Sequence, residues 1–255
     1  MIGIFDSGVG GLSVFREIRK VLPEQSYVYY SDNAHCPYGE KVREYIIDRA
    51  RAITRFLIDK GCEIIVVACN TATAAAISTL REEFPVKFIG MEPAIKPAAQ
   101  STRTGVVGVL ATAGTLKATK YLDTREKWAR NVRIAEHIGQ GFVELVESGK
   151  VSGPEAEATV RTSLMPLLES GADTIVLGCT HYPFLIDTIS KIADEEFPER
   201  KVKVIDPAPA VARHLLEVMR QEGIDETSPE GYRVELNSSG DPAGLVRTFD
   251  SLVRE

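Results

Sequence analysis

Short apolar runs rich in β-branched residues alternate along this chain with segments of helical periodicity. The first two runs are Ile2–Phe5 and Tyr27–Tyr30, and the apolar residues between them recur at helical spacing at Leu12, Phe15, Ile18 and Leu22. Strands that alternate with helices form parallel sheets covered by helices on both faces. The alternation therefore predicts an α/β fold with doubly wound, mostly parallel sheets.

The same pattern continues to the end of the chain. Further strands are expected at 64–68, 87–90, 106–110, 132–136, 174–178, 202–205 and 232–236. A long helix is marked by the apolar residues Val42, Tyr45, Ile46, Ile53 and Phe56 and is ended by Lys60-Gly61. Other helices are expected from about residue 71 to before Pro85, and near 115–129, 141–149, 154–170, 184–196 and 210–222.

The length and the breaks in the pattern predict two domains. A chain of 255 residues is long for a single core. Pro93 and Pro97 interrupt the alternation, which restarts after a polar stretch, and Pro207-Ala208-Pro209 has the composition of a return hinge. We expect one domain at 1–97 plus 209–255 and a second at 98–208. Their similar strand-Cys segments favour pseudo-two-fold halves with a cleft between them.

Composition excludes several classes of partner. With 44% apolar residues, 26% charged residues and a net charge of −6, the chain lacks the basic excess that nucleic acid requires. It has neither a secretory apolar region nor a run long enough to span a membrane, so a cytoplasmic protein is expected. The four cysteines have irregular spacing, which predicts neither disulfides nor a metal site.

Two cysteines end apolar strands and are followed by polar residues. Cys69 lies in Ala68-Cys69-Asn70-Thr71, and Cys179 lies in Gly178-Cys179-Thr180-His181. Ligands of doubly wound sheets bind beyond the carboxyl ends of the strands, where Asp6 and Thr112 also fall. We expect Cys69 and Cys179 to be functional, with their sulfurs on either side of one small substrate. Cys36 and Cys62 are expected to be structural.

The other polar residues near these strand ends have two interpretations each. Asp6–Gly11 is either an anion-binding loop at a helix N-terminus or a tight strand-to-helix turn, and it lacks the register of a nucleotide or dinucleotide site. His181 is either a loop histidine or a partner of Cys179. Asp6 is either a functional carboxylate or an ordinary turn residue. From the residues alone, Glu147 is expected to be a solvated helical carboxylate, Thr112 a strand end and Thr115 a helix cap.

Four separated motifs together carry a resemblance to a known family. They are Asp6-Ser7-Gly8-Val9-Gly10-Gly11, Pro37-Tyr38-Gly39, Ala68-Cys69-Asn70-Thr71 and Gly178-Cys179-Thr180-His181-Tyr182-Pro183. In this order, and nearly end to end, the chain resembles the glutamate racemases. His-Tyr-Pro after the second cysteine is unlike the aspartate racemases, so glutamate is favoured as the substrate. The chain departs from the family at Ile138-Gly139-Gln140-Gly141, where Ala-Cys-Pro is common, and at Ala111, where glycine is usual.

The resemblance implies a cofactor-independent racemase with two α/β domains, which supplies D-glutamate for peptidoglycan and is a homodimer. It implies that Cys69 and Cys179 are the two acid/base residues, with Asp6 near the first, His181 near the second, and Asp32 and Glu147 as further catalytic carboxylates. The residues implied to bind the amino acid comprise these two cysteines with Asp6 and His181, and also Ser7, Pro37, Tyr38, Gly39, Asn70, Thr71, Thr112, Thr115 and Thr180.

Two thiols suit the chemistry of racemisation. One base must remove the α-proton while an acid returns a proton to the opposite face, and the two residues exchange roles in the reverse direction. The alternatives are a two-cysteine racemase or isomerase for aspartate, a hydantoin or another small diacid, a hydrolase with one cysteine nucleophile, and a binding protein with two α/β domains.

Overall fold

The computed structural model describes residues 1–253, and these form two compact units. The first unit contains Met1–Met91 and the chain from Ala208 onward, and the second contains Glu92–Pro207. The chain thus leaves the first unit before the expected crossing at residue 98, because helix α4 (Ile95–Ser101) packs its buried Ile95 and Ala98 in the core of the second unit.

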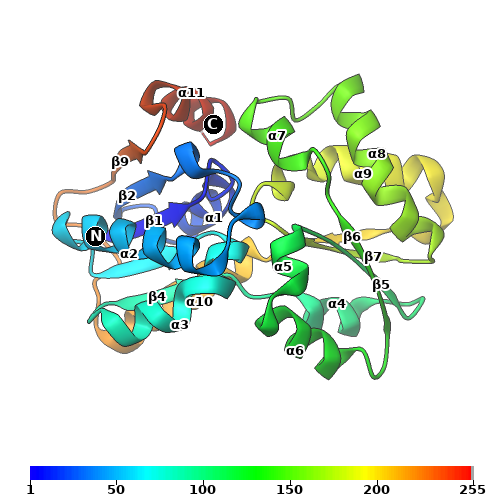
Figure 1. The fold of residues 1–255 in the computed structure, drawn as a ribbon, viewed down its shortest axis with the longest axis horizontal. Coiled ribbons are helices and arrows are strands. Elements are labelled where there is room, and N and C mark those ends of the chain that lie inside the picture. The colour runs from blue at the N-terminus through cyan, green and yellow to red at the C-terminus, as the bar shows by residue number, and fades with distance from the viewer. Residues whose placement is uncertain (254–255) are drawn as a thin grey trace. The chain divides into compact units, whose positions relative to one another are not determined.

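The first unit is built around one five-stranded sheet (Figure 1). Its strands are β1 (Ile2–Asp6), β2 (Ser26–Ser31), β3 (Ile64–Val67), β4 (Lys87–Gly90) and β9 (Arg233–Ser238). They lie in the order β4-β3-β1-β2-β9, and every neighbouring pair is parallel. Its helices are α1 (Leu12–Val21), α2 (Arg43–Asp59), α3 (Asn70–Glu83), α10 (Ala208–Glu222) and α11 (Pro242–Leu252), with short 3₁₀ turns at Asn33–His35 and Tyr38–Glu40.

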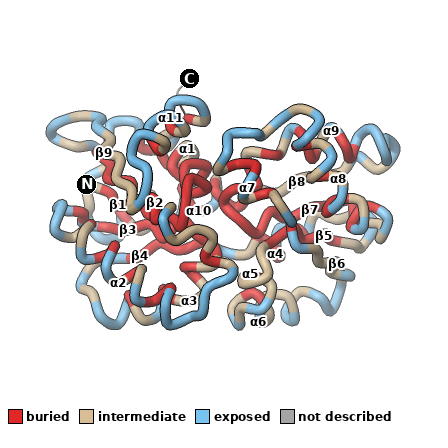
Figure 2. Tube along the Cα trace, turned by 45° about the horizontal axis from the view of Figure 1, so that its top comes forward, coloured by how far each residue is buried: buried red, intermediate tan, exposed pale blue. Residues whose placement is uncertain are grey.

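Helices cover both faces of this sheet. Phe5, Ile65 and Val67 belong to one buried cluster with residues of α2 and α3. Because alternate residues of a strand point to opposite faces, the equally buried Ile4 and Val66 face the other side. There α1 packs against α10, and the Phe15 ring of α1 lies 5.6 Å from the Phe249 ring of α11. The central strands are therefore buried on both faces, whereas the edge strand β9 is only partly buried (Figure 2).

The second unit has a four-stranded parallel sheet in the order β6-β5-β7-β8. Its strands are β5 (Val106–Ala111), β6 (Arg133–Ile138), β7 (Thr174–Gly178) and β8 (Lys203–Ile205). Besides α4, its helices are α5 (Ala113–Lys117), α6 (Thr119–Trp128), α7 (Phe142–Glu147), α8 (Pro154–Glu169) and α9 (Ile186–Glu196), with 3₁₀ turns at Tyr182–Leu185 and Pro198–Arg200.

Its two faces are also both covered. Val107, Val109 and Val176 pack with residues of α4 and with Tyr121 of α6. On the opposite face, α8 contacts β5 and β6 and packs against α9. Two all-parallel sheets with helices on both faces confirm the predicted fold class. None of the described helices combines the length and the apolar character needed to cross a membrane.

Several local predictions were wrong. Helix α4 forms despite Pro97, because this residue lies in the first turn, where its missing N–H has no intrahelical partner to lose. The helix expected at 115–129 is two helices, α5 and α6, that meet at Ala118. Val42 and Tyr45 lie at the exposed start of α2 rather than on its buried face. Helix α11 was not predicted at all.

Candidate active site

Cys69 is the N-cap residue of helix α3. It follows β3 directly, it is buried, and its Sγ accepts a hydrogen bond from the amide of Ala72 at 3.4 Å. A helix N-terminus carries partial positive charge and unpaired N–H groups, both of which favour a thiolate over a thiol. The strand-to-helix step therefore places this sulfur where a negative charge is stabilised.

The loop after β1 brings two more predicted residues to Cys69. The thiol of Cys69 lies 3.7 Å from Ser7 Oγ, and Ser7 Oγ lies 3.5 Å from Asp6 Oδ1. Asp6 is fully buried, and its Oδ2 accepts a hydrogen bond from the Gly11 amide at 2.8 Å. Gly11 is required here because a Cβ would lie 2.7 Å from the Cβ of Asp6. The loop thus aligns a carboxylate, a hydroxyl and a thiol.

The first turn of α3 adds polar side chains beside the sulfur. Asn70 is 9% exposed, and its buried Oδ1 has no hydrogen-bond partner among the described residues. A buried amide oxygen without a partner costs free energy, and an amine ligand would supply the missing donor. Thr71 is half-buried. The nearby Thr73 is held in place, because its hydroxyl donates to Val67 O and accepts from the Met91 amide.

Asp32 and the segment Pro37–Gly39 form one network. Asp32 is fully buried and accepts two hydrogen bonds from Arg49, at 2.7 and 2.9 Å, and one from the Tyr38 hydroxyl at 2.5 Å. Burial by itself raises the pKa of Asp32, but the hydrogen bonds from Arg49 and Tyr38 and the Arg49 charge outweigh it and hold that pKa below its usual value. Asp32 is thus an anion at neutral pH, and its oxygens already accept hydrogen bonds.

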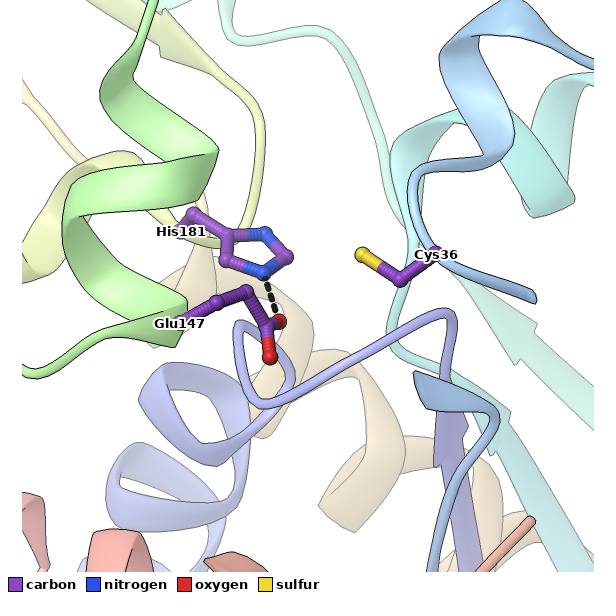
Figure 3. A group of neighbouring side chains, drawn as sticks. All are labelled: Cys36, Glu147 and His181. Atoms are coloured by element: carbon purple, nitrogen blue, oxygen red, sulfur yellow. Dashed lines mark hydrogen bonds and ion pairs between the residues drawn. The ribbon is translucent and has the colours of Figure 1, made fainter. Parts of the chain in front are cut away.

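Cys179 of the second unit has side-chain partners instead of a helix amide. It follows β7, and its Sγ lies 3.7 Å from His181 Nδ1. The other ring nitrogen, Nε2, lies 2.6 Å from Glu147 Oε1 at the end of α7, as Figure 3 shows for the pair. His181 is buried, and the Glu147 side chain is 24% exposed. A thiol, an imidazole and a carboxylate thus form a chain.

The carboxylate decides which nitrogen of His181 carries the proton. An ionised Glu147 is only an acceptor, so the hydrogen bond at 2.6 Å places a proton on Nε2. In the neutral imidazole, Nδ1 is then an acceptor directed at the thiol of Cys179. His181 can therefore take up the thiol proton and return it.

The predicted threonines occupy two places in the second unit. Thr112 directly follows β5 and caps α5, with its Oγ1 accepting from the Thr115 amide at 3.2 Å and lying 3.0 Å from the Thr115 hydroxyl. The helix cap is therefore Thr112, whereas Thr115, for which that role was expected, lies inside α5. Thr180 is buried between Cys179 and His181. Within either unit taken alone, the described residues offer no group of three His, Cys, Asp or Glu side chains close enough to hold a metal ion.

Sequence reasoning missed two partners of Asp32, namely Arg49 and Ser239. Arg49 does carry a signal, because it lies between Ile46, Ala50 and Ile53 on the face of α2 that is buried. A charged residue within an apolar stripe requires a buried counter-charge. Ser239 carries no such signal, since only the register of β9 against β2 brings it to the loop.

Comparison with known proteins gives consistent matches. The sequence pattern of the Asp/Glu/hydantoin racemases matches residues 3–215. A glutamate racemase of Stutzerimonas stutzeri is 44% identical over 98% of this chain and 93% of its own. Two crystal structures of glutamate racemases superpose closely. The Escherichia coli enzyme, in complex with L-glutamate and the activator UDP-MurNAc-ala, has a TM-score of 0.84 and 35% identity over 96% of this chain and 91% of its own. The Francisella tularensis enzyme, in complex with D-glutamate, has a TM-score of 0.83 and 28% identity over 100% of this chain and 93% of its own.

Proposed function

The chain belongs to the Asp/Glu/hydantoin racemase family, and from this premise we propose that it interconverts L- and D-glutamate by proton transfer at the two thiols of Cys69 and Cys179. Relatives named glutamate racemase support the substrate, as do neighbours solved with L- and with D-glutamate. The observation that carries the proposal is the pair of strand-end thiols, each with its own proton partners.

Different groups assist the ionisation of the two thiols. A free thiol is only about 3% ionised at pH 7, so forming the base costs about 2 kcal/mol without assistance. At Cys69 the Ala72 amide stabilises the thiolate, and Asp6 accepts the thiol proton through Ser7. At Cys179 the proton passes to His181, which Glu147 holds in the required tautomer. Either residue is then able to start as the base, as a reversible reaction requires.

Removing the α-proton leaves negative charge on the α-carboxylate. Without an electron sink, hydrogen-bond donors around that carboxylate must stabilise the developing enediolate. The donors that we assign to this role are hydroxyls and amides next to the two cysteines, namely Ser7, Thr71, Thr112, Thr115, Thr180 and the loop of Pro37, Tyr38 and Gly39. Asn70, with its unpartnered Oδ1, suits the substrate amine.

We further place the enzyme in the cytoplasm as a homodimer that supplies D-glutamate for peptidoglycan. Family membership supports this role, and the chemistry requires the reduced thiols that a reducing compartment maintains. Within the described residues, none of the four cysteines forms a disulfide.

The proposal is tested by substitution and by isotope exchange. Cys69→Ser and Cys179→Ser should each lower kcat by about 10² or more, because an alcohol is a far weaker acid than a thiol. Circular dichroism of L- and D-glutamate measures the turnover. Cys62→Ala is the matched control, since Cys62 is a buried thiol that precedes β3, at the opposite end of that strand from Cys69.

In D₂O, the product formed by the native enzyme should carry deuterium at the α-carbon. Retention of the original hydrogen, or full activity of either serine variant, would reject the two-thiol mechanism.

One observation favours a second candidate. The chain Cys179–His181–Glu147 has the order of nucleophile, base and orienting carboxylate found in cysteine hydrolases. A hydrolase would form an acyl-cysteine at Cys179 and leave Cys69 without a role. Assay of ester and amide hydrolysis in the two serine variants distinguishes the two functions, because a hydrolase would lose turnover in Cys179→Ser and keep it in Cys69→Ser, whereas a racemase shows no such turnover.

A further inference from the structure

Asp32 joins three distant segments of the first unit. Its carboxylate accepts hydrogen bonds from Arg49 on α2, from Tyr38 in the loop after β2, and from Ser239 beyond β9. The Asp32 side chain is fully buried, and that of Arg49 is 25% exposed. Breaking a buried ion pair leaves an uncompensated charge, so the pair holds its partners firmly. We call these four residues, Asp32, Tyr38, Arg49 and Ser239, the loop clasp.

The loop clasp reaches the surroundings of Cys69 through Tyr38. The Tyr38 side chain is 1% exposed and belongs to the same buried cluster as Cys69 and Ala72. Its hydroxyl donates to Asp32, so the hydrogen bond to the clasp carboxylate fixes the position of this side chain within the cluster that contains Cys69. Because Pro37 and Gly39 flank Tyr38 in the chain, their backbone is held in place together with the Tyr38 side chain.

The C-terminal segment supports the same loop from its outer side. Ser239 Oγ accepts from the Ala34 amide at 3.1 Å, and its own amide donates to Ser31 O at 3.0 Å. Ser238 Oγ donates to Asn33 Oδ1 at 2.8 Å. These serines lie beyond residue 215, where the match to the family pattern ends. The loop is therefore fixed by a part of the chain that the common pattern does not include.

We propose that Arg49 and Ser239 are positioning residues that act through Asp32 to hold Pro37–Gly39 in the conformation in which it meets the amino-acid substrate. This inference rests on the proposed function of that segment. It assigns Asp32 to anchoring, because an anion whose oxygens accept several hydrogen bonds is poorly placed to exchange a proton with a substrate. A loosened loop must be ordered at each binding event, which weakens binding and leaves the chemical step intact.

The test compares Arg49→Lys and Ser239→Ala with matched controls. Lysine keeps the charge but loses the two-pronged contact with the carboxylate. KM for glutamate should rise about tenfold in Arg49→Lys and about threefold in Ser239→Ala, with kcat within about twofold of the native value, as expected when binding alone is lost.

The second unit offers the same chemistry away from the predicted site residues. Tyr121 and Arg125 both donate to Glu136, at 2.7 and 3.0 Å, so Arg125→Lys is the control for Arg49→Lys. The control for Ser239→Ala lies in the first unit. There Ser26, at the opposite end of β2 from the loop, donates a hydrogen bond to Ser228 at 3.0 Å, so Ser228→Ala is the matched variant. Both controls should leave KM unchanged.

A second readout does not depend on turnover. The amides of His35 and Lys41 donate to Asp32 O and Tyr38 O inside the loop, at 2.9 and 3.0 Å. Their hydrogen exchange should accelerate in Arg49→Lys and Ser239→Ala and stay at the native rate in both controls. Unchanged KM together with unchanged exchange would overturn the loop clasp, as would equal KM changes in variants and controls. Absence of racemisation by the native protein would instead reject the proposed function, and the exchange rates would still decide the clasp.

Discussion

The two cysteines differ in what surrounds each sulfur. Cys69 has a helix amide and, through Ser7, a buried carboxylate, whereas Cys179 has an imidazole that is itself held by Glu147. The first arrangement stabilises the anion directly. The second provides a group that takes the proton away. The surroundings of the two thiols are therefore not interchangeable, although the proposed mechanism gives both thiols the same chemistry.

This difference predicts a selective effect of Glu147→Gln. The glutamine amide can donate to Nε2 of His181 and so allows the tautomer with the proton on Nδ1, which no longer accepts from the thiol. We expect kcat to fall by about 10- to 100-fold with KM changed little, in the range seen when a partner that orients a functional histidine is removed.

The measurement is circular dichroism of both enantiomers over a range of pH. Exposed Glu144, one turn earlier on α7, provides the control variant Glu144→Gln. Equal activity of the two variants would show that the His181–Glu147 contact has no part in the reaction.

Several of the residues in these arrangements were predictable. Cys69, Cys179, Asp6 and His181 follow apolar strands directly, and the carboxyl ends of parallel strands are where α/β sheets gather ligands. Glu147 was harder, because the closure of α7 toward His181 is a tertiary contact with no local pattern. Arg49 was visible only as a charge within an apolar stripe, and Ser239 depends on the pairing of β9 with β2.

At the scale of elements, the strands were predicted well and the helices less evenly. Buried strands have unmistakable runs of Val and Ile, and β9 was expected where it occurs. Helices α4 and α11 were not predicted. Each has a proline near its N-terminus, and a proline predicts the end of a helix unless its position within the helix is known. In both cases the proline lies in the first turn and costs no hydrogen bond.

Helix α11 contributes Leu245 and Phe249 to the core of the first unit. Phe249 is buried against Phe15 of α1. Phe249→Ala should lower the free energy of unfolding by about 3 kcal/mol, as a large-to-small change in a core does. Val246→Ala, on the exposed side of the same helix, should change it by less than about 0.5 kcal/mol.

Urea unfolding followed by circular dichroism measures both variants. If they were equally stable, Phe249 would contribute nothing to the core of the first unit.

At the scale of the whole molecule, stability should depend on pH through the buried carboxylates. The pKa of Asp32 is lowered in the folded protein, because the hydrogen bonds from Arg49 and Tyr38 outweigh the effect of burial. A folded pKa below the unfolded one contributes stability that is fully present above about pH 4 and is lost as pH falls through the folded value.

Asp32→Asn should therefore be less stable than the native protein at neutral pH. The two curves of unfolding free energy against pH should converge in acid, where the native Asp32 is itself protonated. The control is Asp123→Asn at an exposed carboxylate, and its curve of unfolding free energy against pH should run parallel to that of the native protein. A constant offset for Asp32→Asn down to the lowest pH would contradict the assignment.

The route of the chain between the two units has a consequence for how the protein is made. The second unit is one unbroken segment, Glu92–Pro207, whereas the first needs the sequence from Ala208 onward to supply α10, β9 and α11. On the ribosome, the middle of the polypeptide is therefore ready to collapse while the N-terminal half still lacks an edge strand and two covering helices. The nascent β2 edge and the apolar side of α1 stay open to chaperones until the segment that forms α10, β9 and α11 has been synthesised.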